Sequence, residues 1–192
     1  MKYFRFIRHA LTTGNLERRY IGRTDEPLCE EGVLSARAAS EAGLPALDAV
    51  YTSPYLRCVQ TANILFPKYA PVIVNELREC DFGLFENKSA DELANDTAYA
   101  QWLATNCTAK IPEGEDVREF KERCCSAFIQ IAEVTQESSH TAIVTHGGCV
   151  MAILERFARP KREFYEWHIP NCGYLDCAFD GVLLTLTGGS LC

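Results

Sequence analysis

Short apolar runs alternate with stretches of helical spacing along this chain. Residues 2–7 form a run typical of a strand, and residues 28–42 repeat apolar side chains at helical spacing up to Gly43. The alternation continues, with strands expected at 49–51, 72–74 and 142–144 and helices at 54–66, 116–134 and 149–157. Strands that alternate with helices are typical of an α/β fold with a mostly parallel sheet.

Residues 81–112 blur this pattern. Only short helical pieces are expected there, at 90–94 and 97–104, and this segment is the best candidate for a cover over a site. The end of the chain predicts a hairpin of strands 174–179 and 182–187, joined at Asp180-Gly181. No repeat, low-complexity tract or linker divides the sequence, which indicates a single domain over residues 1–192.

The composition is that of an ordinary globular domain, with 192 residues, 47% hydrophobic and 23% charged. A net charge of −7 argues against nucleic acid or an anionic membrane as the partner, whereas clustered arginines can still bind a small anion. No apolar run approaches the ~20 residues that span a bilayer, and the N-terminal residues do not resemble a signal peptide. We therefore expect a cytoplasmic protein; the sequence leaves its oligomeric state open.

The chain has ten cysteines, which allow three interpretations. A disulfide framework does not suit a chain of this size without a leader. A zinc site needs paired ligands at close spacing, and neither the adjacent Cys124-Cys125 nor the pair Cys172 and Cys177 gives a convincing set. We expect most of the cysteines to be small buried side chains in a reducing compartment.

Polar side chains follow the predicted parallel strands, at the point where each strand ends. They are, in chain order, Arg8 and His9, Ser53 and Arg57, Glu79, and His146 with Gly147 and Gly148. The carboxyl ends of parallel strands meet at one edge of a sheet, where ligands bind. Two arginines, two histidines and a helix N-terminus at this edge predict a cradle for a dianionic phosphoryl group.

The residue types also suggest a reaction. One histidine attacks phosphorus and carries the phosphoryl group, while the arginines and the second histidine neutralise charge on its oxygens. A carboxylate protonates the departing alkoxide and later takes a proton from water. This chemistry requires no metal or other cofactor, and no aspartate cluster suggests a metal site.

The same residues stand in motifs that resemble the histidine phosphatase, or phosphoglycerate-mutase-like, superfamily. Residues 8–15 resemble its RHGxTxxN motif, residues 20–28 its Y-x-G-R-x-D-x-P-L segment, and residues 53–62 its S-x-x-x-R-x-x-x-T-A helix. Residues 77–83 resemble its L-x-E-x-x-x-G segment and residues 144–148 its second histidine motif. The resemblance covers nearly the whole chain and implies a three-layer α/β/α fold with a mostly parallel central sheet.

The resemblance also implies roles for particular residues. His9 is the phosphorylated nucleophile, Glu79 is the acid–base, and His146 belongs to the catalytic set. The implied phosphate pocket consists of Arg8, Arg57 and His146, completed by Thr12, Asn15, Gly22 and the amide of Gly147.

The chain departs from the family pattern at two positions. Ala10 stands where the family usually has glycine after the nucleophile, and its methyl group matters if that position needs a positive φ or a close backbone approach. Asn87 replaces the glycine that usually follows the second glutamate, Glu86. Asp81 and Glu86 are the alternative candidates for the acid.

Two further histidines are interpreted as structural. His140 precedes its strand and is expected at the end of the sheet opposite the site, and His168 is expected to pack or bond locally beside its aromatic neighbours.

Three functions remain open. The modest length of the segment between Glu79 and the helix at 116–134 favours a phosphatase over a mutase, and with the residue chemistry above we expect a metal-independent hydrolase of a small phosphorylated metabolite. Residues 22–28 look most like the alpha-ribazole-5′-phosphate phosphatases, which makes alpha-ribazole 5′-phosphate a candidate substrate in cobalamin biosynthesis. The alternatives are a cofactor-dependent phosphoglycerate mutase and an inactive phospholigand-binding module.

Overall fold

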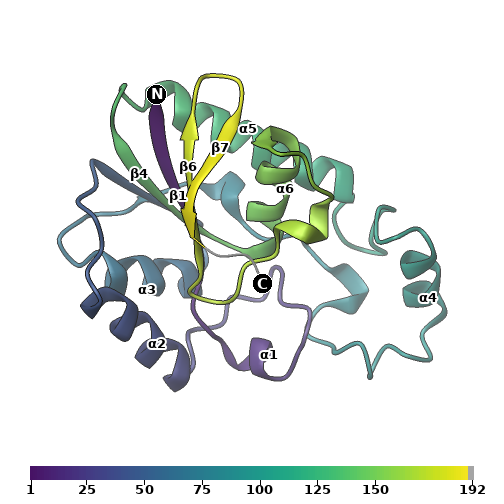
Figure 1. Ribbon diagram of the computed structural model, residues 1–192. Coiled ribbons are helices and arrows are strands. Elements are labelled where there is room, and N and C mark those ends of the chain that lie inside the picture. The colour runs from purple at the N-terminus through teal and green to yellow at the C-terminus, as the bar shows by residue number, and fades with distance from the viewer. Residues whose placement is uncertain (190–192) are drawn as a thin grey trace.

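A central sheet separates two layers of helices in the computed structural model, which describes residues 1–189 (Figure 1). The sheet has seven strands, in the order β3 (Val72–Ile73), β2 (Ala49–Thr52), β4 (His140–Thr145), β1 (Lys2–Arg8), β6 (Tyr174–Phe179), β7 (Leu184–Gly189) and β5 (Ala158–Arg159). The strands β3, β2, β4 and β1 run parallel, and β5 is parallel to β7. Only the pairings of β6 with β1 and with β7 are antiparallel, so the predicted α/β fold with a mostly parallel sheet is confirmed.

The helices α2 (Glu30–Glu41) and α3 (Leu56–Leu65) cover one face of the sheet, and α5 (Val117–Val134) and α6 (Gly147–Phe157) cover the other (Figure 1). Neighbouring strand residues point to opposite faces. Phe6 of β1 therefore packs against Phe128 of α5, with 5.6 Å between ring centroids, whereas Ile7 joins a cluster with Ala62 of α3. Alternate side chains of β1 thus pack against both helical layers.

The N-termini of α5 and α6 differ in how their first backbone N–H groups are bonded. Asp116 caps α5, because its side chain accepts hydrogen bonds from the backbone N–H groups of Arg118 and Glu119. The N-cap residue of α6, His146, makes no side-chain hydrogen bond to this helix, which begins at Gly147, two residues before the predicted start. Its first N–H groups therefore face the carboxyl edge of the sheet, where that of Gly148 donates to the carboxylate of Glu79.

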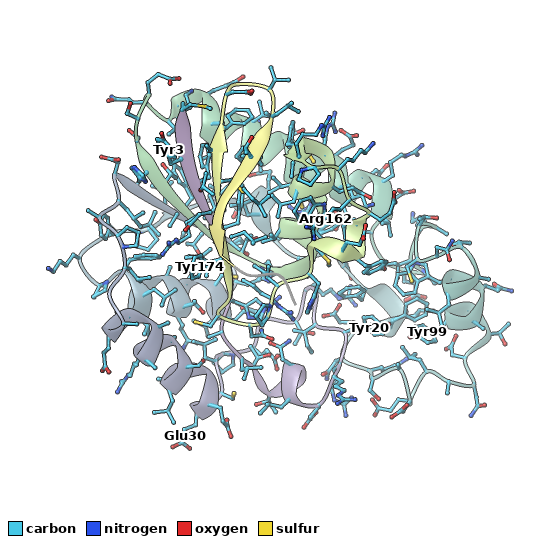
Figure 2. All side chains as sticks on the ribbon, viewed as in Figure 1. Tyr3, Tyr20, Glu30, Tyr99, Arg162 and Tyr174 are labelled. Atoms are coloured by element: carbon cyan, nitrogen blue, oxygen red, sulfur yellow. The ribbon has the colours of Figure 1, made fainter. Side chains whose placement is uncertain are left out.

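The remaining helical elements are short. They are α1 (Thr13–Leu16), α4 (Thr97–Ala104) and the 3₁₀ helices η1 (Asn75–Leu77), η2 (Gly83–Phe85) and η3 (Phe164–Trp167). The predicted helix at 97–104 is confirmed, whereas residues 90–94 form turns and that prediction is wrong. Figure 1 shows α4 standing away from the sheet, and Figure 2 shows Tyr99 of α4 beside Tyr20, where the two hydroxyls lie 2.8 Å apart.

Two turns shift elements from their expected bounds. The helix expected from residue 54 begins at Leu56, so Pro54 precedes it instead of lying in its first turn. The second strand of the hairpin begins at residue 184 instead of 182, because Asp180 accepts hydrogen bonds from the N–H groups of Val182 and Leu183 and widens the turn.

His140 is the first residue of β4, and its ring stacks on Tyr3 at the amino end of β1.

The nine cysteines that the structure describes are all free thiols, and six of them are buried. Within residues 1–189, no His, Cys, Asp and Glu side chains gather into a group that could hold a metal ion. The same part of the chain contains no helix with the length and apolar character needed to cross a membrane.

Candidate active site

The ends of β1 and β4 bring two histidines together. His9 directly follows β1 and donates its backbone N–H to the carbonyl of Thr145, the last residue of β4, at 2.9 Å. His146 directly follows β4, and its ring centroid lies 5.2 Å from that of His9 at an interplanar angle of 66°. Strand pairing thus places the two rings side by side.

The hydrogen bonding of His9 defines which ring nitrogen can react. Nδ1 of His9 lies 2.8 Å from the carbonyl oxygen of Ala10, and a carbonyl oxygen only accepts, so Nδ1 carries the proton. Burial first, and then the positive charges of Arg57 and Arg8, lower the pKa of His9 well below its usual value. The ring is therefore neutral near pH 7, with a lone pair on Nε2.

His146 is fully buried behind His9. Its Nε2 lies 2.7 Å from the hydroxyl of Ser53, which follows β2. The ring of Tyr55 packs against it in a T-shaped arrangement, with 5.6 Å between centroids. Burial, followed by the positive charge of Arg57, lowers the pKa of His146 well below its usual value. A dianion placed beside this ring favours its protonated form and raises that pKa.

Arg57 reaches the site from α3 and has no exposed surface. Its guanidinium donates to the carbonyl oxygens of Thr24 and Gly22 at 2.8 and 2.9 Å, which ties the loop after α1 to the site. Among the described residues, Nε of Arg57 has no hydrogen-bond partner. This buried N–H is a donor that an anion can use.

Glu79 lies at the N-terminus of α6. Its carboxylate accepts hydrogen bonds from the backbone N–H groups of Gly148, at 3.1 Å, and Cys80, at 2.9 Å. Burial raises the pKa of Glu79, and these two hydrogen bonds and the charges of Arg57 and Arg8 oppose it only in part. A carboxyl group with a raised pKa is suited to give up a proton near neutral pH.

The alternative acids have other contacts. Glu86 accepts hydrogen bonds from the backbone N–H groups of Gly22, Thr24 and Phe82. Asp81 accepts from the N–H of Gly83 and lies 3.4 Å from Arg23. Both carboxylates stabilise loops, and neither lines the cavity described below.

Of the other residues that the resemblance names, two line the cavity and two support the loop around it. Asn15 and Gly147 line the cavity. Thr12 instead caps α1, where its side chain accepts a hydrogen bond from the N–H of Asn15. Gly22 uses its amide on Glu86, and a Cβ atom at this position would overlap the carbonyl oxygen of Cys80. Thr12 and Gly22 therefore support the loop that surrounds the cavity.

The two departures from the family pattern fit the backbone. Ala10 does not have a positive φ, and its methyl group is buried with Leu28 and Ala36. Its N–H donates to the hydroxyl of Thr61 at 3.0 Å. Asn87 does adopt a positive φ, of 58°, and asparagine tolerates this region better than most residues other than glycine.

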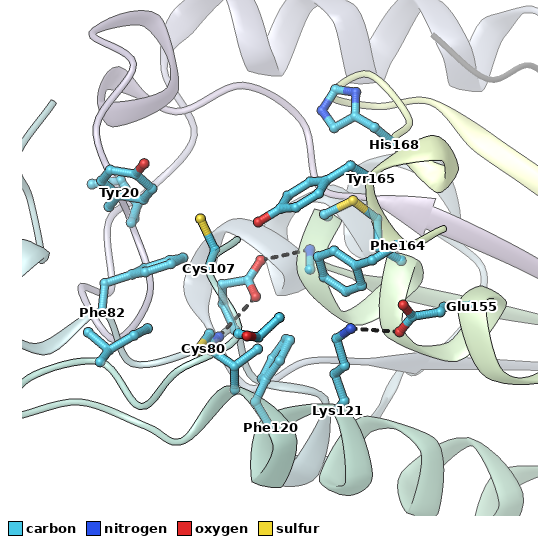
Figure 3. A pocket seen from close by; sticks show the side chains of 18 of the residues that line it. Tyr20, Cys80, Phe82, Cys107, Phe120, Lys121, Glu155, Phe164, Tyr165 and His168 are labelled. Atoms are coloured by element: carbon cyan, nitrogen blue, oxygen red, sulfur yellow. Dashed lines mark hydrogen bonds and ion pairs between the residues drawn. The ribbon is translucent and has the colours of Figure 1, made fainter. Parts of the chain in front are cut away.

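A cavity of about 560 Å³ opens in front of these groups (Figure 3). Five predicted site residues line it, namely Arg8, His9, Asn15, Glu79 and Gly147, whereas Arg57 and His146 lie behind its wall. The segment 81–112, expected as a cover, contributes several lining residues, among them Trp102 and Cys107.

His168 is a site residue that sequence reasoning missed. It follows η3, lines the cavity, and lies with Nε2 2.9 Å from Nη1 of Arg8. The same Nη1 donates to the carbonyl of Ile169 at 3.1 Å. A guanidinium only donates, so Nε2 of His168 accepts and the bond requires a neutral ring. The aromatic neighbours of His168 in the sequence carry no signal of this long-range contact.

Comparison with known families agrees with this geometry. Residues 4–186 match the model of the histidine phosphatase superfamily, branch 1. The chain belongs to this superfamily. It is therefore an enzyme of the histidine phosphatase type, as the motifs around His9 and His146 imply.

Individual members of the superfamily differ in the activity that their names give. The chain is 31% identical over 174 residues to a probable phosphoglycerate mutase of Yersinia pestis. This alignment covers 86% of this chain and 80% of that protein. A putative alpha-ribazole-5′-P phosphatase of Escherichia coli superposes with a TM-score of 0.88 at 21% identity, over 98% of this chain and 96% of that chain. A phosphoglycerate mutase of Thermus thermophilus superposes with a TM-score of 0.75 at 27% identity, over 97% of each chain.

Proposed function

We propose that this protein hydrolyses a phosphomonoester of a small metabolite through a phosphohistidine on His9. The observation that carries the proposal is the hydrogen bond from Nδ1–H of His9 to the Ala10 carbonyl, which leaves Nε2 as the nucleophilic nitrogen. The lowered pKa keeps this nitrogen unprotonated at neutral pH. A neutral, oriented imidazole beside a cavity is what attack on phosphorus requires.

In the first step, Nε2 of His9 forms a bond to phosphorus and the bond from phosphorus to the alcohol oxygen breaks. Glu79 gives its proton to the leaving alkoxide and becomes a carboxylate. In the second step, Glu79 takes a proton from water, the resulting hydroxide attacks phosphorus, and the bond from phosphorus to nitrogen breaks. Inorganic phosphate and neutral His9 result.

The positive groups around His9 stabilise the charge on the transferring phosphoryl group. Arg8 lines the cavity, and Arg57 retains the buried Nε donor. His146 becomes a charged donor once the dianion raises its pKa. Because these side chains and the N-terminus of α6 supply the positive charge, we expect the reaction to proceed without a metal ion.

Two specific activities have support. Alpha-ribazole 5′-phosphate is favoured by residues 22–28, which resemble the phosphatases for this ester. Phosphoglycerate mutase activity is the second candidate, because the relatives at 30–31% identity bear that name.

Labelling and turnover together test the proposal. With a ³²P-labelled aryl phosphate in EDTA, we expect one labelled histidine per chain and steady release of phosphate, both lost in His9→Ala. His140→Ala is the matched control, since His140 lies at the opposite end of β4 and should leave both unchanged. Interconversion of phosphoglycerates that depends on bisphosphoglycerate, without net hydrolysis, would favour the mutase. Tight binding of phosphate esters without label or turnover would identify a binding module.

A further inference from the structure

The cavity extends well beyond the phosphate-binding groups. Its volume of about 560 Å³ falls in the range of about 300–1,000 Å³ that encloses drug-sized ligands. Figure 3 shows Tyr20 and Phe82 on one side of this space and Phe164 and Tyr165 on the other, with Phe120 below them. The space for the alcohol part of the substrate is thus bounded by aromatic rings.

These rings are held in place on both sides. Tyr20 packs on Phe82 with 5.1 Å between ring centroids. Across the cavity, Phe164 packs edge-on against Tyr165 at 5.0 Å. Tyr165 nevertheless keeps 61% of its surface exposed, which is a large apolar area for a ligand to cover.

Two cations that line the cavity, Lys121 and Arg19, are already paired with carboxylates. Lys121 lies 2.7 Å from Glu155, and its ammonium sits 4.2 Å from the ring centroid of Phe164. Arg19 is paired with Glu17 at 2.6 Å and with Glu92 at 2.8 Å. A second anionic group on the substrate would have to compete with these carboxylates for the two cations.

We propose that the cavity selects phosphomonoesters whose alcohol carries a planar aromatic ring system and no carboxylate. Phe164 and Tyr165 are the specificity-determining residues, because both line the cavity and Tyr165 keeps most of its surface exposed. The Lys121–Glu155 pair disfavours acidic alcohols such as glycerate. This inference rests on the proposed hydrolysis at His9 and assigns its substrate class.

Primary alkyl phosphates test the inference, because they share one leaving-group chemistry and differ only in what fills the cavity. We expect kcat/KM for 2-(1-naphthyl)ethyl phosphate to exceed that for n-butyl phosphate by roughly tenfold to a hundredfold, from the apolar area that the ring buries. We expect 3-phosphoglycerate to rank below n-butyl phosphate.

Variants separate the contribution of the aromatic rings from that of the Lys121–Glu155 ion pair. Tyr165→Ala and Phe164→Ala should each lower kcat/KM for the naphthyl ester by roughly fivefold to tenfold more than for n-butyl phosphate. Tyr165→Phe, which keeps the ring, is the matched control and should retain the preference. Glu155→Gln removes the partner of Lys121 and should raise kcat/KM for 3-phosphoglycerate relative to n-butyl phosphate by roughly threefold to tenfold.

The two proposals fail in different ways. If n-butyl phosphate is hydrolysed and His9 is labelled but the naphthyl group gives no advantage, the substrate class is overturned and the hydrolase stands. If no ester is hydrolysed, calorimetric binding of the matching non-hydrolysable phosphonates decides the inference. Tighter binding of the naphthyl phosphonate, lost in Tyr165→Ala, supports it, and equal binding of the two phosphonates overturns it.

Discussion

Gly148→Ala tests whether Glu79 works from the place where the N-terminus of α6 holds it. A Cβ atom at Gly148 would lie 2.5 Å from Oε1 of Glu79 and 3.1 Å from Cζ of Phe120. A Cβ atom at the adjacent Gly147 would approach Arg8 no closer than 3.4 Å, which is ordinary contact. Two neighbouring glycines therefore give a matched pair of substitutions, of which only one displaces the carboxyl group.

The size of the effect follows from this overlap. Contacts of a Cβ atom below 3.0 Å are essentially absent from proteins, so the carboxyl group must move by at least about 0.5 Å and weaken its 3.1 Å bond to the Gly148 N–H. The clash falls on the end of a flexible side chain, and alanine gains up to about 1 kcal/mol over glycine in a helix. The protein should remain folded, while misplacement of the acid lowers the rate roughly tenfold to a hundredfold.

The assay compares two esters by kcat/KM, which reports the steps up to departure of the alcohol. An alkyl phosphate has a basic leaving group that needs a proton, whereas p-nitrophenyl phosphate has a stable leaving group that needs little help. For Gly148→Ala we expect kcat/KM to fall roughly tenfold to a hundredfold on the alkyl ester and less than fivefold on the aryl ester. Gly147→Ala should show the smaller effect on both, and neither substitution should lower Tm.

Two results would refute this reasoning. An equal loss on both esters would mean that the displaced group does not protonate the leaving alkoxide. Full activity of Gly148→Ala would mean that Glu79 acts from another position or that a different group is the acid.

Three further predictions concern stability and metals. Because burial lowers the pKa of His9 and His146, the unfolded chain binds protons below about pH 6.5 that the folded chain does not. The two histidines should therefore make the urea-derived free energy of unfolding fall as pH falls through about 6.5, and His146→Gln should make this fall smaller, measured in a Glu79→Gln background because the raised pKa of Glu79 acts in the opposite direction. Ala10→Gly should lower that free energy by about 1 kcal/mol with unchanged kcat, since Ala10 has no positive φ and a buried methyl group; a gain in stability or rate would contradict the packing argument. Dialysis against EDTA should leave turnover unchanged, and a loss restored by a divalent cation would disprove the metal-independent reaction.

The elements of the fold were readable because their signals are local. Apolar spacing along α5, with Phe120, Cys124, Phe128 and Ile131 on one face, depends only on the helical period, and this helix starts within one residue of its predicted position. The errors lie where side chains and backbone compete over a few residues. Asp180 bonds two following N–H groups and delays β7, a choice that hydrophobic pattern does not record.

The sequence by itself determined that Arg8, His9, Ser53 and His146 meet at one edge, because the carboxyl ends of β1, β2 and β4 share that edge in any parallel arrangement of these strands. It did not determine what each residue does there. Glu79 and Glu86 are the same residue type a few positions apart, and only the tertiary structure places one against the N-terminus of α6 and binds the other to loop amides. The contact of His168 with Arg8 joins segments from opposite ends of the chain. Such contacts depend on distances in space, which local periodicity does not encode.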